Sequence, residues 1–141
     1  MTKNRPMFRW GTCLVFLIAC GPPPTNTNTN DNRTIEITGN WQSQWGEESI
    51  TETHWNTAEL ISFDNTTNQA ITQLPDDDEY NPNKFSATVW TEPVDGQFHY
   101  CTFTYGHNTQ EEAETADNNT DINDLDGEGC GGFPWTKLEA Q

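Results

Sequence analysis

Beyond residue 33, apolar and polar residues alternate in short runs, the period typical of β-strands with one buried face. Between residues 34 and 41, every second position is apolar or glycine: Ile35, Ile37, Gly39 and Trp41. The intervening side chains are polar, so this run predicts a strand that begins near Thr34. A polar run with β-strand composition at residues 48–53 predicts a second, exposed strand.

The middle of the chain contains further strand signals separated by turn residues. Residues 60–63 and 69–74 predict two short strands. Asp64 and Asn65 start the turn between them, because Asx side chains form hydrogen bonds with the nearby backbone. An acidic segment with two prolines at residues 75–83 predicts a loop.

Two longer strands are predicted at residues 84–91 and 97–105, with a turn at residues 93–96 between them. In the first, Trp90 points away from the face formed by Phe85, Ala87 and Val89. The second has apolar side chains on both faces: Phe98 and Tyr100 on one, Cys101, Phe103 and Tyr105 on the other. A strand of this kind is covered on both sides, so it belongs in the centre of the fold.

One helix and one last strand complete the pattern. Residues 109–116 predict a short helix, since Thr109 and Glu112 have the spacing of a capping box. The last strand begins at Phe133. Short strands with hairpin-like turns predict an all-β domain, a small antiparallel β-sandwich or barrel with one short helix.

The first residues have a different composition. They carry Lys3, Arg5 and Arg9 without an acidic residue, followed by an apolar stretch that begins at Cys13. This stretch is too short to span a bilayer as a permanent helix, so residues 1–19 predict a signal peptide.

The run Leu-Ile-Ala-Cys that ends at Cys20 resembles the lipobox of bacterial lipoproteins, in which the cysteine is lipidated and becomes the new N-terminus. The resemblance implies an anchor of several acyl chains, which holds a membrane stably. Gly21, in place of an Asp retention signal, favours the outer membrane and leaves its periplasmic and cell-surface faces open. The alternative is a plain thiol in an uncleaved anchor helix. Residues 20–33 predict a flexible tether, and 34–141 a single domain.

Acidic residues dominate the charge. The chain has 6 basic and 22 acidic residues and a formal net charge of −16. Cleavage before Cys20 removes three basic residues and no acidic one, which leaves three against 22. Such a surface repels nucleic acid and anionic lipid, and it favours solubility.

Two cysteines remain after the signal peptide and the lipidated residue are set aside. Cys101 and Cys130 lie in an exported, oxidising setting, which predicts a disulfide. Two free thiols, or half of a metal site, are the alternatives.

Two candidate sites follow from local motifs. Gly39-Asn40-Trp41 resembles the opening of lipocalins and avidins, which implies a barrel cavity lined by Trp41, Phe98 and Tyr100; a Trp that plugs a small β-fold is the alternative. Oxygen ligands for calcium cluster in one loop: Asp121, Asn123, Asp124, Asp126 and Glu128. The EF-type pattern is broken there by Ile122, so a solvated acidic loop is the alternative.

The sequence favours a protein without catalytic activity. The three histidines, His54, His99 and His107, are interpreted as isolated side chains, although His99 and His107 would approach if one strand end folded back. The sequence contains no nucleophile elbow, HExxH motif or glycine-rich phosphate loop.

Six segments carry a further resemblance: ITGNW at 37–41, FDN at 63–65, FSATVWT at 85–91, HYC at 99–101, TQEEAETA at 109–116 and GCGGFPWTKL at 129–138. Together they resemble a family of small lipoproteins of deltaproteobacterial type. The resemblance implies a shared fold and a bridge between Cys101 and Cys130, and it supplies no activity.

These observations predict a lipid-anchored, non-enzymatic lipoprotein of the cell envelope that acts as a structural or interaction module. Its expected partners are the membrane, through the anchor, and envelope or surface proteins, with no nucleic acid and no cofactor. The alternatives are a calycin-like carrier of a small hydrophobic ligand and a calcium-binding envelope protein.

Overall fold

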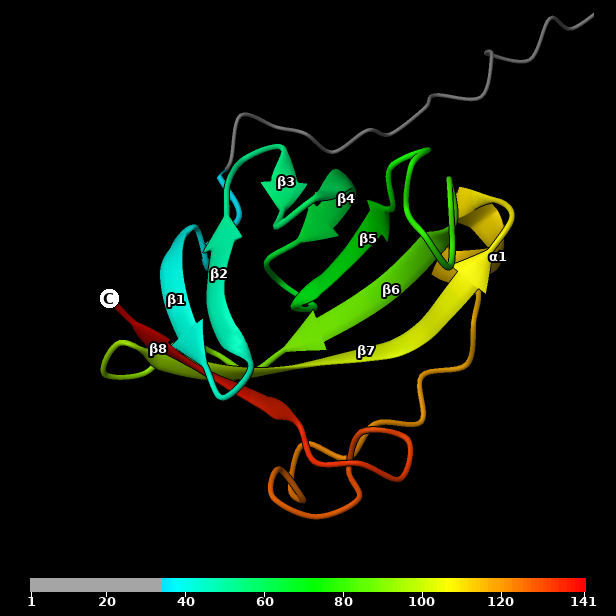
Figure 1. Cartoon of the computed structure of the whole chain (residues 1–141). Helices are drawn as coiled ribbons and strands as arrows, with labels where there is room; N and C mark the ends of the chain where they lie inside the picture. Colours follow the sequence, from blue (N-terminus) through cyan, green and yellow to red (C-terminus); the bar gives the residue numbers. More distant parts are fainter. Residues whose placement is uncertain (1–33) are drawn as a thin grey trace, which may run out of the picture.

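The computed structural model describes residues 34–141 and shows one closed barrel of eight antiparallel strands (Figure 1). The elements are β1 (Gly39–Ser43), β2 (Gly46–Ile50), β3 (His54–Trp55), β4 (Ala58–Asp64), β5 (Gln69–Gln73), β6 (Phe85–Trp90), β7 (Gln97–His107), α1 (Gln110–Glu114) and β8 (Thr136–Ala140). Each strand pairs with the next along the chain, and β8 pairs with β1 to close the barrel. The all-β prediction is confirmed, with the barrel as its correct form.

The expectations for the signal peptide, Cys20 and the tether concern residues 1–33, which lie outside the described residues. Within residues 34–141, no helix has the length and apolar character needed to cross a membrane.

The first predicted strand is only partly correct. Residues 35–38 form a turn, in which the Thr38 N–H and hydroxyl both donate to the Ile35 carbonyl, and β1 begins at Gly39. The side chains of Ile35 and Ile37 are fully buried all the same. The alternation therefore predicted burial correctly, but a turn also satisfies that pattern when it covers the end of a barrel.

An apolar core fills one end of the barrel. It contains Ile35, Ile37, Trp41, Ile50, Trp55, Leu60, Ala70, Trp90, Phe98 and Leu138. Trp41 packs edge-on against Phe98 at 4.7 Å between ring centroids, and its indole N–H donates to the Ile37 carbonyl at 2.9 Å. The Trp90 indole donates to the Glu36 carboxylate at 2.7 Å. These contacts fasten the turn at residues 35–38 to the core.

The outer face of β6 and β7 is covered as well. Ala87 packs with Ile71 and with Ala113 of α1, while Val89 packs with Cys101 and Trp135. Helix α1 begins where the capping box predicts, because the Thr109 hydroxyl accepts a hydrogen bond from the Glu112 N–H. The segment from α1 to β8 runs along the outside of β7 (Figure 1, orange to red).

A disulfide joins Cys101 of β7 to Cys130, with 5.6 Å between the Cα atoms. It is the pairing that the cysteine count predicted. The bridge holds the long segment before β8, which has no strand pairing of its own between α1 and Cys130, against the barrel wall.

Candidate functional site

The interior of the barrel contains a cavity of about 220 Å³ beside the apolar core. We call it the barrel cavity, and it is lined by Glu48, Trp55, Asn56, Ala58, Thr72, Leu74, Ser86, Thr88, Tyr100 and Thr102. Successive side chains of a strand point to opposite faces, so alternate residues of β6 and β7 contribute to the lining while their neighbours face the outer clusters. Six strands, β2 to β7, therefore contribute to the lining.

Glu48 organises the polar part of this cavity. One of its carboxylate oxygens accepts a hydrogen bond from the Tyr100 hydroxyl at 3.0 Å. The other accepts from the Trp55 indole N–H at 3.1 Å and from the Asn56 amide at 3.3 Å. Burial raises the pKa of the Tyr100 phenol, and the charge and hydrogen bond of Glu48 raise it further. Tyr100 therefore remains a protonated donor over the ordinary pH range.

Hydroxyl side chains form the opposite wall. Thr72, Ser86 and Thr88 are all buried, and the Thr88 and Thr102 hydroxyls are hydrogen-bonded to each other at 2.8 Å. Hydroxyl groups both donate and accept, so this wall can bind polar groups of either kind. Glu48 is the one carboxylate in the lining, and the lining contains no basic side chain.

The structure brings only one of the three residues expected at a ligand site to this cavity. Tyr100 lines it, whereas Trp41 and Phe98 pack against each other in the apolar core. Sequence reasoning missed Glu48, because residues 48–53 were assigned to an exposed strand. Its spacing of two from Ile50, which is buried, was the available sign that both side chains face inward.

The five oxygen ligands proposed for calcium do not converge within the described structure. Asp121 accepts from the backbone and side-chain amides of Asn123, and Asp124 accepts from the Glu128 N–H at 2.9 Å. Asp126 lies apart from them and lines an outer groove. Among residues 34–141, no three His, Cys, Asp or Glu side chains are grouped so that they could hold a metal ion. In this loop the carboxylates serve mainly as caps for its own backbone.

We expect Gly129→Ala to lower the free energy of unfolding by about 2–3 kcal/mol, because the added methyl group has no room. Its Cβ would lie 2.2 Å from the Asp124 carbonyl oxygen and 2.4 Å from that of Asp121. Urea unfolding measures the effect. Gly131→Ala is the matched control: its Cβ meets open space, so only its φ of 62° opposes the change, at about 1 kcal/mol. Equal losses in the two variants would contradict the packing of this loop.

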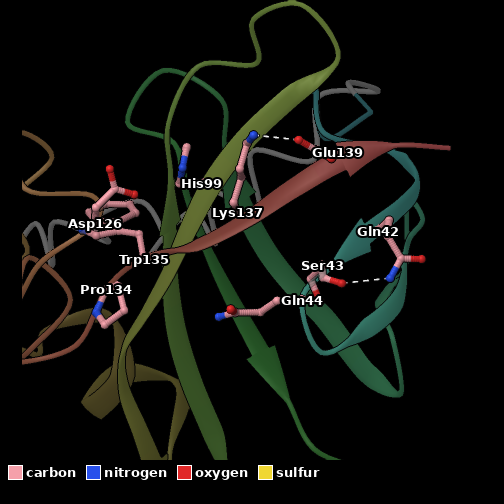
Figure 2. A pocket seen from close by; sticks show the side chains of 9 residues that line it. All are labelled: Gln42, Ser43, Gln44, His99, Asp126, Pro134, Trp135, Lys137 and Glu139. Atoms are coloured by element: carbon pink, nitrogen blue, oxygen red, sulfur yellow. Dashed lines mark hydrogen bonds and ion pairs between the residues drawn. The ribbon is translucent and has the colours of Figure 1, made fainter.

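The outer groove of about 470 Å³ crosses β1, β7 and β8 (Figure 2). It is lined by Gln42, Ser43, Gln44, His99, Asp126, Pro134, Trp135, Lys137 and Glu139. Burial lowers the pKa of the His99 imidazole, which Asp126 partly offsets and Lys137 reinforces. Lys137 forms an ion pair with Glu139 at 2.6 Å, drawn as a dashed line in Figure 2. The one lysine of the groove is already paired with Glu139, so it is not free to bind a ligand. We therefore place the candidate site in the barrel cavity.

The histidines are separate. His99 and His107 lie near opposite ends of β7, and His107 forms a hydrogen bond with Thr104. His54 forms a hydrogen bond with Thr53 at 2.9 Å. The structure therefore does not assemble them into a common site.

A second surface groove, of about 620 Å³, lies over the disulfide. Trp45, Tyr105 and Phe133 line it and are each at least 71% exposed. We call it the aromatic groove.

Comparison of the chain with protein-family models, with curated proteins and with solved structures finds no match in any of the three. The resemblance to small lipoproteins of deltaproteobacterial type therefore stays a prediction, and the functional argument rests on the geometry of the barrel.

Proposed function

We propose that this protein is a non-enzymatic binding protein of the bacterial envelope, which holds a small polar molecule in the barrel cavity. The observation that carries the proposal is the cavity inside a closed eight-stranded barrel, with a carboxylate and hydroxyl groups in its wall. A barrel of eight strands is just wide enough to be filled by side chains or to hold one small ligand. Here the apolar core fills part of the interior, and the cavity lies beside it.

The size and lining of the cavity favour a small polar ligand over a hydrophobic one. Sites for drug-sized molecules measure about 300–1,000 Å³, so about 220 Å³ suits a smaller compound. An apolar ligand would shield the hydroxyls of Thr72 and Ser86 from water without offering a hydrogen bond. Each buried polar group left unpaired costs about 1–3 kcal/mol. The proposed polar ligand therefore differs from the small hydrophobic ligand of the calycin-like alternative.

The N-terminal segment supplies the location in this proposal. Lipidation of Cys20 would anchor the protein in the outer membrane. Residues 20–33 would then join the anchor to the barrel, and the barrel would meet solutes of the surrounding fluid.

Filling the cavity is expected to abolish binding. We predict that a panel of amines, amino acids, sugars and polyols contains compounds that raise the melting temperature of the wild type by several degrees, because a ligand that binds only the native state stabilises it. Ala58→Phe, which places a ring in the cavity, should remove this effect. Ala140→Phe is the matched control, since Ala140 is exposed on β8.

Two results would contradict the proposal. One is a panel in which no compound shifts the wild-type melt. The other is a shift that persists undiminished in Ala58→Phe, which would place the binding outside the barrel cavity.

An interaction role is the second candidate, and the aromatic groove favours it. A cluster of large exposed aromatic side chains, such as the one in this groove, is typical of a surface that contacts another protein. In this role the protein would dock another envelope protein over its disulfide, and the barrel cavity would be empty in the cell.

A further inference from the structure

The geometry points to a small organic cation, an amine or quaternary ammonium compound, as the ligand of the barrel cavity. In this arrangement the positive charge is received by Glu48, beside the rings of Trp55 and Tyr100. The inference rests on the proposed function and names its ligand class.

Glu48 forms no ion pair with a lysine of the described residues. Residues 34–141 contain two basic residues, Lys84 and Lys137. Lys84 donates to Asn108, and Lys137 pairs with Glu139, so neither neutralises the carboxylate in the cavity. Glu48 is half-buried, and a partly desolvated charge gains from an opposite charge beside it. A bound cation would supply the charge that the described chain does not.

The Glu48 carboxylate can accept one more hydrogen bond than the protein supplies. An ionised carboxylate has about four acceptor positions. Tyr100, Trp55 and Asn56 occupy three of them and hold both oxygens in place. These three donors are neutral, so they orient the charge without cancelling it. A fixed carboxylate with one free acceptor position is suited to an ammonium group.

Two aromatic rings, those of Trp55 and Tyr100, lie beside the Glu48 carboxylate. The centroids of Trp55 and Tyr100 are 5.1 Å apart with an interplanar angle of 63°, and both side chains line the cavity. Cations are attracted to aromatic ring faces, most strongly to Trp, and cages of this type bind quaternary ammonium groups. The two rings pack edge to face on each other, so a cation at Glu48 would contact only the ring surface that lines the cavity, in addition to the carboxylate.

The charge of the whole protein disfavours the other ligand classes. With a net charge of −16, the chain repels anions and concentrates cations around itself. An anionic ligand would also meet Glu48 directly. A neutral sugar or polyol would satisfy the hydroxyl wall but leave the charge of Glu48 without a partner.

Choline and its neutral isostere 3,3-dimethylbutan-1-ol test the inference, because they have the same shape and differ in charge. Isothermal titration of the full chain is expected to show choline binding at least tenfold tighter than the alcohol. The difference should shrink as salt is raised, because salt screens the attraction. Glu48→Gln, which keeps the size of the side chain and removes its charge, should weaken choline binding at least tenfold.

Glu47→Gln is the matched control, since it removes the charge of the neighbouring, exposed glutamate of β2, which does not line the cavity. It should leave choline binding unchanged. If Glu48→Gln fails to fold, the comparison of choline with the alcohol in the wild type decides the question without it.

The failure of this inference can be told from the failure of the proposed function. Two results would contradict a cationic ligand but agree with the proposed binding function. One is equal binding of choline and the alcohol, and the other is tight binding of a neutral or anionic compound that Ala58→Phe abolishes. If no compound of any class binds in the barrel cavity, both proposals are overturned.

Discussion

Trp41→Ala is expected to destabilise the protein by about 3–5 kcal/mol, the cost of truncating a large buried aromatic residue. Trp41 is 7% exposed, packs on Phe98, and donates its indole N–H to the Ile37 carbonyl. Its loss would leave a void at the closed end of the barrel and would release the turn that covers it. Urea unfolding followed by far-UV circular dichroism measures the change.

Trp45→Ala is the matched control for this experiment. The same substitution is made four residues away, at a side chain that is 79% exposed in the β1–β2 hairpin. A surface change of this kind costs about 0.5 kcal/mol or less. Similar losses at the two positions would show that Trp41 does not close the barrel as the structure describes.

Replacing Cys101 and Cys130 together by Ala is expected to cost about 3–4 kcal/mol, because the bridge closes a loop with a sequence separation of 29 residues. For a domain of about 100 residues this corresponds to a fall of roughly 15 °C in melting temperature. The backbone hydrogen bonds of residues 117–135 stay within the loop, and the loop packs on Val89 through Trp135, Leu125 and the bridge. Its release should therefore also expose Val89.

Thermal melts with and without a reducing agent check this prediction. The wild type should fall to the melting temperature of the double variant when it is reduced, and the variant should not respond to reduction. A double variant that melts within about 3 °C of the oxidised wild type would contradict the stabilising role of the disulfide.

Much of the fold could be predicted from local pattern. The alternation in residues 84–91 placed Trp90 opposite Ala87 and Val89, and the structure puts Trp90 in the barrel core and the other two outside. The turn at Asp64 was also predicted, and its carboxylate accepts from the Thr66 N–H at 2.7 Å. These features depend on neighbours within a few residues, so the sequence contains the information directly.

The barrel cavity could not be predicted in the same way, because it depends on contacts between distant segments. Glu48 meets Tyr100 across 52 residues of sequence, and Trp90 meets Glu36 across 54. The spacing from Ile50 indicates that Glu48 faces inward, but only closure of the sheet brings it to Tyr100. The turn at residues 35–38 was missed for a related reason, since its two isoleucines are buried by the end of the barrel and not by strand pairing.

Native mass spectrometry of the full chain, recovered from a bacterial envelope, shows whether the barrel cavity holds a small molecule. We expect the folded, disulfide-bonded protein to carry one discrete extra small-molecule mass, which leaves as a cation on collisional activation and is missing from Ala58→Phe. A bare mass for the folded wild type, with the disulfide intact, would contradict the account and direct attention to protein partners of the aromatic groove.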